Sequence, residues 1–139
     1  QKGAKMSYAL DVGTNQLAWK LRQDDRVVVM ENTNFRYSKK DDFTSGQPDF
    51  ATIDVSFISL HLILPNLHSI IKEGGSVVAL IKPQFEAGRE KVGKHGIVHD
   101  PKTHLEVVQD IMAFSASVGY DVCELDFLRS PVVRETSNF

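Results

Sequence analysis

The sequence predicts an α/β domain with a mostly parallel, doubly wound sheet. Short apolar runs rich in Val, Ile and Leu alternate along the chain with segments of helical periodicity. Strands that alternate with helices pair in parallel, because right-handed crossovers return the chain to the same end of the sheet. Ligands of such sheets bind outside the carboxyl ends of the strands. Functional residues are therefore expected at those ends.

Composition supports one soluble domain. The 139 residues suffice for a single core, and 42% hydrophobic with 24% charged residues is ordinary for a globular protein. A net charge of −2 argues against a surface that binds nucleic acid everywhere, but it leaves room for a local basic patch. The single cysteine, Cys123, excludes an internal disulfide and favours a reducing, cytoplasmic location. No segment approaches the roughly 18 apolar residues of a membrane span.

Five strands are expected from short apolar runs bounded by glycine, proline or polar residues. They cover residues 8–10, 26–30, 49–57, 77–81 and 120–128. The fourth, VVALI, is a continuous apolar run, which is typical of a strand covered on both faces. The fifth alternates enough to be an edge strand, and its cysteine is interpreted as a small core residue.

Helices are expected over residues 13–23, after Pro65 and over residues 100–119. Thr14 or Asn15 can cap the first helix. The second ends at a glycine pair. The third has the clearest signals, because Asp100 can cap it, Pro101 falls in its first turn and Gly119 follows it. Residues 32–48 form a polar connection.

Polar side chains follow four of the strands: Asp11, Glu31, Asp54 and Lys82. Asp11 could accept hydrogen bonds from a ribose diol, or it could simply favour a helix dipole. Asp54 and Lys82 emerge side by side if their strands are neighbours. They could form a structural ion pair. Alternatively, burial and a nearby cation would lower the lysine pKa from about 10.4 and make the amine a proton acceptor.

Two long motifs resemble the TlyA-type hemolysin and FtsJ-like ribosomal RNA methyltransferase family. They are DVSFISL and ALIKPQFEAGRE with the VGK, GI and DP that follow. YALDVGTNQLAWKLR and RVVVMENTNFR are similar to that family too, so the resemblance covers roughly residues 3–131. It implies a Rossmann-like S-adenosylmethionine-dependent methyltransferase fold. It also implies methylation of a ribose 2′-hydroxyl, with ribosomal RNA or a ribosomal subunit as the partner.

The resemblance also implies roles for individual residues. Asp11 would hold the ribose of S-adenosylmethionine, and Glu31 and Asn34 would lie near the adenine. Asp54 and Lys82 match two members of the family's Lys-Asp-Lys-Glu tetrad. Lys82 would deprotonate or orient the 2′-hydroxyl, and Asp54 would position the lysine.

The loop after Lys82 weakly favours an RNA substrate. Residues 82–104 contain five Lys or Arg against three acids, and Arg89, Lys91 and Lys94 are the candidate RNA-binding residues. A solvated surface loop explains this composition equally well. The histidines of the loop lack the spacing of a zinc motif. The aromatic residues Trp19 and Phe35 are interpreted as packing residues.

Several parts of the family pattern are missing from the chain. The glycine-rich cofactor turn, the first tetrad lysine and the N-terminal S4-like RNA-binding domain of the family have no counterpart here. The stretch SPVVRETSNF does not match the family's approach to the tetrad glutamate, so that role is not assigned to Glu135. We therefore expect an incomplete methyltransferase domain, lacking its first strand, from a longer protein whose isolated fragment is inactive.

Three other functions remain open. The hemolysin name suggests a membrane-active protein, although the sequence has no amphipathic insertion helix. An NAD-dependent dehydrogenase could use Asp11 for its ribose, but there is no G-x-G-x-x-G motif and no use for the Asp54–Lys82 pair. A non-catalytic nucleotide- or cofactor-binding module would leave Lys82 without a chemical role.

Overall fold

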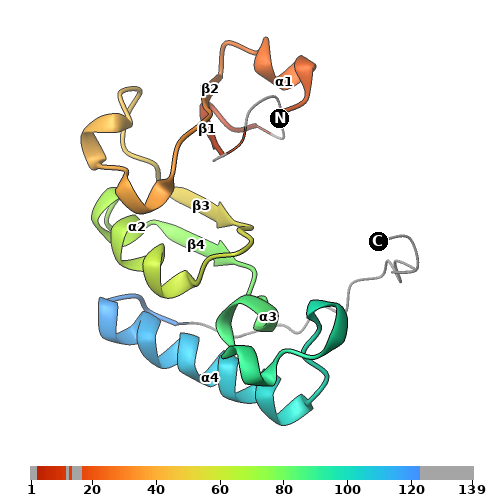
Figure 1. The fold of residues 1–139 in the computed structure, drawn as a ribbon. Helices are drawn as coiled ribbons and strands as arrows, with labels where there is room; N and C mark the ends of the chain where they lie inside the picture. The colour runs from red at the N-terminus through yellow and green to blue at the C-terminus, as the bar shows by residue number, and fades with distance from the viewer. Residues whose placement is uncertain (1–2, 12, 14–16, 123–139) are drawn as a thin grey trace.

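The computed structural model describes residues 3–11, 13 and 17–122 (Figure 1). Its strands form two parallel pairs. Strand β1 (Ser7–Leu10) pairs with β2 (Val27–Met30), and β3 (Phe50–Ile53) pairs with β4 (Ser76–Ala79). The predicted α/β class and parallel pairing are confirmed. Among the described residues, however, the pairs are two separate sheets and not one continuous sheet.

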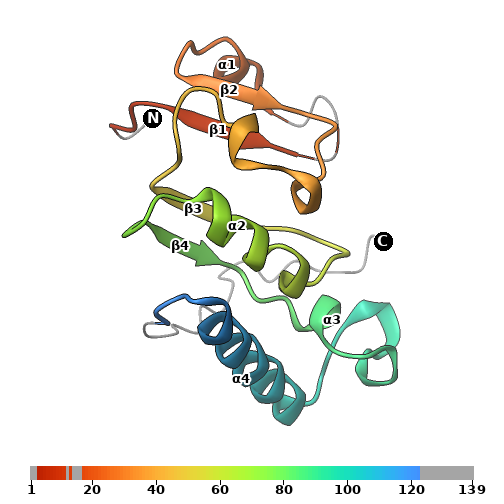
Figure 2. The same ribbon diagram turned by 90° about the vertical axis from the view of Figure 1, so that its left-hand side faces the viewer.

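Four α-helices accompany the strands: α1 (Trp19–Arg22), α2 (Leu64–Ile70), α3 (Pro83–Glu86) and α4 (Pro101–Val118). Short 3₁₀ helices occupy the connections: η1 (Phe35–Tyr37), η2 (Lys40–Asp42), η3 (Leu60–Leu62), η4 (Arg89–Lys91) and η5 (Lys94–Gly96). Each strand pair is bridged by a crossover that contains one of these helices, α1 in the first pair and α2 in the second (Figure 2).

The longest helix, α4, follows its sequence signals closely. The Asp100 carboxylate accepts a hydrogen bond from the Lys102 backbone N–H at 3.0 Å, as an N-cap does. Pro101 occupies the first turn, and Gly119 ends the helix at φ 118°, a left-handed conformation that favours glycine. The predicted bounds of α4 are confirmed within one residue. They could be predicted because the capping residues are adjacent to the helix in the sequence.

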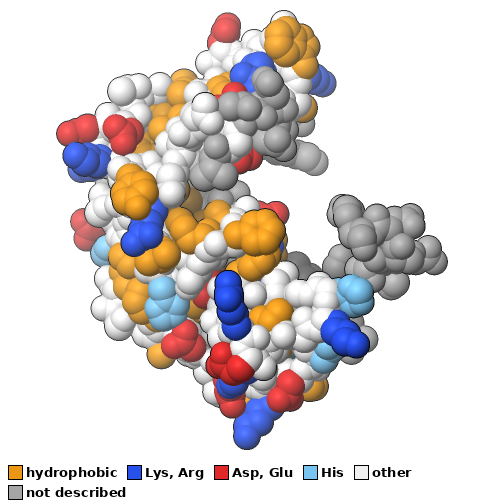
Figure 3. Space-filling model, in the orientation of Figure 1, with side chains coloured by type: hydrophobic (Ala, Val, Ile, Leu, Met, Phe, Trp, Pro, Cys, Tyr) orange, Lys and Arg blue, Asp and Glu red, His pale blue; other side chains and the backbone are white. Residues whose placement is uncertain are grey.

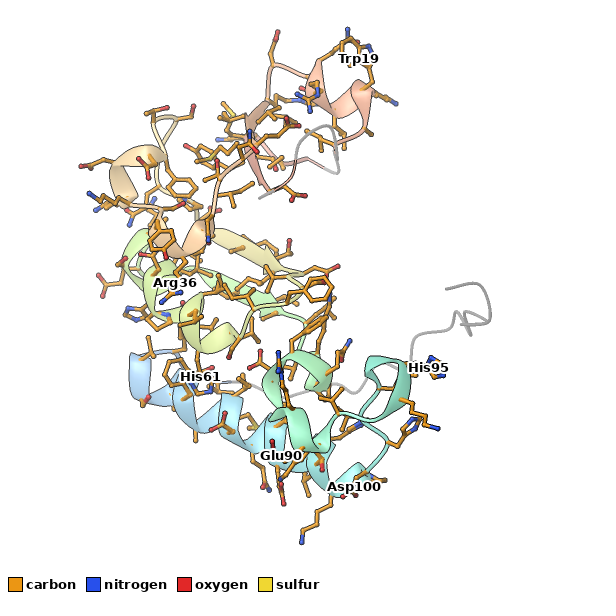
Figure 4. All side chains as sticks on the ribbon, in the orientation of Figure 1. Trp19, Arg36, His61, Glu90, His95 and Asp100 are labelled. Carbon is orange, nitrogen blue, oxygen red and sulfur yellow. The ribbon has the colours of Figure 1, made fainter. Side chains whose placement is uncertain are left out.

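Helix α1 departs from its prediction. It begins at Trp19, whose preceding residue Ala18 provides no side-chain cap. The predicted caps Thr14 and Asn15 lie outside the described residues. The side chain of Trp19 is 69% exposed and projects from α1 away from the chain (Figure 4), so its interpretation as a packing residue is wrong. Phe35 does pack against the core, as expected.

The hydrophobic core lies on one face of the β3–β4 pair, beneath α2 and α4. Leu60 and Ile70 are its most completely buried large side chains. The cluster that contains Leu60 consists of Ile53, Leu60, Ile63, Leu64, Leu67, Ile71 and Ile111. Burying a side chain of this size contributes about 1.5–3 kcal/mol, so this cluster dominates the stability of the described chain. It also fixes the loops that follow β3 and β4.

The prediction that the fourth strand is covered on both faces is wrong for the described residues. The side chains of β3 and β4 alternate between the two faces, and only one face meets helices. On the other face Phe50, Val78 and Leu80 are 55%, 57% and 51% exposed. The sequence shows that a strand is apolar on both sides, but it cannot show which segment covers each side. Most of the predicted fifth strand, from Cys123 on, lies outside the described residues.

Candidate active site

Lys82 and Asp54 meet beyond the ends of β4 and β3. The Lys82 Nζ lies 2.5 Å from Asp54 Oδ1 and donates to Ser56 Oγ at 3.2 Å. The parallel register brings both strand ends to the same edge, as the sequence predicted. The side chain of Lys82 is 26% exposed and that of Asp54 is 67% exposed. The lysine side chain is therefore partly buried, while its carboxylate partner remains open to solvent.

A carboxylate that the sequence analysis did not single out joins the loop after β3 to the segment after β4. Glu86, in α3, accepts hydrogen bonds from the Ser59 hydroxyl at 2.6 Å and from the Leu60 backbone N–H at 2.8 Å. Four residues after Lys82, it is thereby fixed to the start of η3. Ser59 caps η3 by accepting a hydrogen bond from the His61 N–H, and neighbouring residues in the sequence could have predicted this role. The hydrogen bond from Ser59 to Glu86 could not have been predicted, because the two residues are far apart in the sequence.

A phenylalanine in the loop after β3 combines backbone strain with an exposed side chain. Phe57 has φ 63°, a conformation that is unfavourable for a bulky residue, and its side chain is 90% exposed. Its ring centroid lies 5.0 Å from that of Phe85. Strained residues cluster at functional sites, where the surrounding structure maintains them. Sequence reasoning missed this residue because backbone φ leaves no pattern in composition.

Asp11 and Glu31 leave the other sheet at one edge, because Leu10 is paired with Met30 in the β1–β2 register. The Asp11 Oδ1 accepts a hydrogen bond from the Gly13 N–H at 2.9 Å, and the residue is exposed. A carboxylate has a second oxygen, which could accept a hydrogen bond from a ribose hydroxyl.

The two adenine-side candidates already have partners in the chain. Glu31 forms an ion pair with Arg22 of α1. The Asn34 Oδ1 accepts a hydrogen bond from the Arg36 N–H at 3.1 Å and so caps η1. Asn34 keeps its amide NH₂ as a donor for a ligand. Of the cofactor candidates, Asp11 and Asn34 therefore fit a ligand role better than Glu31.

The three candidate RNA-binding residues differ in their surroundings. Lys91 Nζ lies 2.9 Å from Glu106 Oε2 of α4, and this contact raises the pKa of Lys91 and lowers the pKa of Glu106. Arg89 and Lys94 form no ion pair with any described residue. His95, which has φ 63°, extends outward from the same loop (Figure 4). The described residues contain no group of three or more His, Cys, Asp or Glu suited to a metal.

The chain belongs to the FtsJ-like methyltransferase family, whose model matches residues 1–138. It is 62% identical over 138 residues to "Putative rRNA methyltransferase YqxC" of Bacillus subtilis, covering 99% of this chain and 48% of that protein. It is 41% identical over 119 residues to "16S/23S rRNA (cytidine-2'-O)-methyltransferase TlyA" of Mycobacterium tuberculosis, covering 86% of this chain and 44% of that protein. The expected family is thus confirmed.

A solved structure shares the fold. The "Putative hemolysin from Streptococcus thermophilus" superimposes with a TM-score of 0.88 at 60% identity, covering 94% of this chain and 46% of that one. The chain thus spans about half the length of the relatives it matches. No helix in the described part of the chain is long and apolar enough to cross a membrane.

Proposed function

We propose that the protein containing this chain methylates a ribose 2′-hydroxyl of ribosomal RNA. The observation that carries the proposal is the Lys82–Asp54 contact of 2.5 Å at the shared edge of β3 and β4, in a chain of the FtsJ-like methyltransferase family. The relatives named as rRNA (cytidine-2'-O)-methyltransferases support this substrate class. A Rossmann-like fold and a place in the cytoplasm, where ribosomes are, belong to the same proposal.

The chemistry assigned to this chain is proton handling at the Lys82 Nζ. The amine orients the 2′-hydroxyl and receives its proton as the oxygen attacks. Asp54, in contact with the same nitrogen, stabilises the ammonium that results. Ser56 accepts a hydrogen bond from Nζ and fixes its direction. A positioned base of this kind contributes about 10²- to 10⁴-fold in rate.

S-adenosylmethionine supplies the electrophilic methyl group of this reaction when it is bound. The described residues fit part of that cofactor. Asp11 has an exposed carboxylate oriented by the Gly13 N–H, which suits a ribose diol. Asn34 offers its amide NH₂ as a donor to the adenine of the cofactor. Glu31 would take part in the same adenine site while paired with Arg22. These residues line only one side of a cofactor site.

RNA would approach over the loop that follows Lys82. Arg89 and Lys94, which are exposed and have no ion-pair partner among the described residues, can contact phosphates. Lys91 can do so only in competition with Glu106. Phe57, in the loop that also carries Asp54, presents an exposed ring, and RNA bases stack on such rings. An S4-like domain elsewhere in the protein would supply further RNA contacts.

The test is methyl transfer to ribosomal RNA by the complete protein, with the modified riboses mapped by 2′-O-methyl-sensitive primer extension. We expect Lys82→Ala to reduce transfer by at least 10²-fold without weakening calorimetric binding of S-adenosylmethionine. Lys72→Ala is the matched control, because Lys72 is an exposed lysine after α2. If Lys82→Ala left transfer intact, the chain would be a cofactor-binding module and not the catalyst.

A membrane-active function is the second candidate, because a relative of Brachyspira hyodysenteriae, 41% identical over 118 residues, is named "Hemolysin A". Dye release from liposomes separates the two functions. We expect no release at concentrations that support methyl transfer. NAD serves as the control ligand in the calorimetric titration, because a dehydrogenase would bind it through the same Asp11.

A further inference from the structure

The 3₁₀ helix η1 exposes an arginine and a tyrosine between two residues that pack inward. Phe35 packs against the hydrophobic core, and Ser38 is 4% exposed. Between them, Arg36 is exposed and Tyr37 is 69% exposed. The inward-packed residues on both sides hold the backbone of the two exposed residues in place. We call Arg36 and Tyr37 the η1 pair.

Side chains from outside η1 fix the backbone of this turn. Asn66 of α2 donates through Nδ2 to the backbone carbonyls of Phe35 and Ser38, at 2.8 and 2.7 Å. The Asn34 side chain accepts a hydrogen bond from the Arg36 N–H and caps the start of the turn. The η1 pair is therefore arranged before any ligand arrives. Groups that are arranged in advance lose less conformational freedom on binding, so more of their interaction free energy appears as affinity.

The guanidinium of Arg36 lies near the ring of Tyr37, with Cζ 5.6 Å from the ring centroid. That separation is within the range of a cation–π contact. The guanidinium forms no ion pair with any residue that the structure describes, whereas Arg26 pairs with Asp24 at 2.7 Å. A guanidinium presents five N–H donors in one plane, which matches the oxygens of a phosphate. An acceptor from outside the described chain fits this arrangement.

The charges around the η1 pair favour an anionic ligand by a small margin, because residues 36–42 hold three basic and two acidic side chains. Lys39 and Lys40 are exposed and form no ion pair with a described residue. Of the two acids, Asp42 accepts a hydrogen bond from the Lys39 N–H at 2.8 Å, and Asp41 is exposed. Figure 3 shows a basic side chain beside a hydrophobic one where Figure 4 labels Arg36, and another basic side chain over α3 on the same face. The η1 pair thus shares a face with the loop over which RNA would approach.

A flat ring beside a planar cation indicates a nucleic acid as the ligand. Unpaired RNA bases stack on aromatic rings, and arginine binds phosphates through paired N–H donors. A docked protein would require a larger apolar surface at the centre of the contact. Within residues 31–49, Tyr37 is the only large hydrophobic residue that is exposed. The surface therefore suits RNA better than a protein partner.

We propose that the η1 pair binds an unpaired nucleotide of the substrate RNA, with its base stacked on the Tyr37 ring and an adjacent phosphate paired with the Arg36 guanidinium. The inference rests on the proposed function, which makes RNA the substrate. This nucleotide is not the one that is methylated, because Figure 4 places Arg36 beside α2 and away from α3, the helix that begins directly after Lys82. The η1 pair selects the substrate through contacts away from the reacting ribose.

The experiment is a filter-binding titration of the complete protein with deproteinised ribosomal RNA at several salt concentrations. The two members of the pair should leave different signatures. Tyr37→Ala should weaken binding by at least about fivefold with an unchanged salt slope, because stacking releases no counterions. Arg36→Ala should weaken binding and reduce the salt slope by about one. Arg36→Lys should keep the slope and lose part of the affinity, because an ammonium keeps the charge but not the planar fork.

Matched variants separate the ring, the charge and the fold. Tyr37→Phe keeps the ring and should bind RNA as the wild type does. Arg26→Ala removes an arginine that is already paired with Asp24, and it should leave RNA binding unchanged. The wild type should bind a single-stranded RNA of about 12 nucleotides more tightly than the same sequence in a duplex, and Tyr37→Ala should reduce this preference. Thermal unfolding verifies that every variant is folded, since the substituted side chains are exposed.

The binding readout is independent of methyl transfer, which is tested through Lys82. Intact transfer in Lys82→Ala would contradict the proposed reaction and leave the η1 pair unaffected. Unchanged RNA affinity in Tyr37→Ala would overturn the inference about the pair. Weaker calorimetric binding of S-adenosylmethionine with unchanged RNA binding would also overturn it, and would assign the pair to the cofactor site. Losses with the assembled ribosomal subunit but not with deproteinised RNA would assign the pair to a ribosomal protein instead.

Discussion

The Glu86 carboxylate accepts a hydrogen bond from the Leu60 backbone N–H at 2.8 Å, and this contact joins the loop after β3, which carries Asp54, to the segment after β4, which carries Lys82. Leu60 is 1% exposed, so the bonded N–H lies next to the core. The Ser59 hydroxyl donates to the same carboxylate. The separation between Lys82 and Asp54 is thus set by a tether on the core side of the site and not only by their own attraction.

Glu86→Ala should therefore destabilise the chain and impair the site. Leaving the Leu60 N–H unpaired costs about 1–3 kcal/mol. The effect is measured by urea unfolding, and by methyl transfer for the complete protein. Glu86→Gln keeps one acceptor oxygen and should restore part of both. Glu90→Ala, on the exposed part of the same loop, is the control. Equal losses in the Glu86→Ala and Glu90→Ala variants would contradict the tether.

Two glycines with nearly the same φ form a matched pair, Gly119 at the end of α4 and Gly46 in the loop before β3. Gly119 and Gly46 have φ values of 118° and 116°, but a Cβ at Gly119 would lie 2.8 Å from His68 Nε2, whereas Gly46 faces open space. Alanine at Gly46 should cost about 1–2 kcal/mol for the left-handed backbone alone. Gly119→Ala should cost more, as measured by thermal unfolding. Adding His68→Ala should remove the excess, and an unchanged difference would refute the clash.

Alkaline pH should destabilise the chain through Tyr120. Its hydroxyl donates to the Leu64 carbonyl at 2.6 Å, and burial raises its pKa from 10.0 to about 12. Because the folded pKa lies above the unfolded one, the stabilisation is complete below pH 10 and is lost as the pH rises toward 12. Tyr120→Phe should cost about 1 kcal/mol at neutral pH and should lose less stability above pH 10. Tyr37→Phe, an exposed tyrosine, should behave as the wild type throughout.

The Lys91–Glu106 pair should affect RNA affinity more than stability. Solvent screens an exposed ion pair and leaves it little net stabilisation, so Glu106→Gln should barely change the unfolding midpoint. It should nevertheless release Lys91 and tighten RNA binding by the complete protein in a filter assay. Arg89→Ala and Lys94→Ala should each weaken binding and reduce the salt slope by about one. A slope unaffected by all three changes would place the RNA elsewhere.

The pair also carries a pH dependence that can be measured separately. The Lys91 ammonium lowers the pKa of Glu106, so the stabilisation is present above the ordinary pKa of 4.5 and is lost as the pH falls through the lower folded value. Difference unfolding curves of wild type and Glu106→Gln between pH 5 and 3 should therefore converge at the acid end. Parallel curves would indicate that the pair does not form in solution.

The sequence predicted those features that depend on near neighbours or on parallel pairing. The bounds of α4 follow from Asp100 and Gly119, and the Lys82–Asp54 contact follows from two strands that end at one edge. The Glu86 tether and the strained Phe57 depend on the path of loops through space, which periodicity does not encode. The prediction that both faces of β4 are covered was wrong for a related reason. An apolar run does not specify which segment, if any, packs on each face of the strand.

The core described above is confined to one part of the chain, and this has a consequence for how the molecule opens. Every buried hydrophobic residue among those described falls between Phe43 and Ile111, and none belongs to β1, α1 or β2. The N-terminal pair should therefore come apart as a separate low-energy unit while the rest persists. Asp11 belongs to the N-terminal unit, which unfolds first, and Lys82 belongs to the part of the chain that stays folded. Any ligand that bridges them would spend part of its binding energy on closing the two together, and would protect the N-terminal unit from proteases in return.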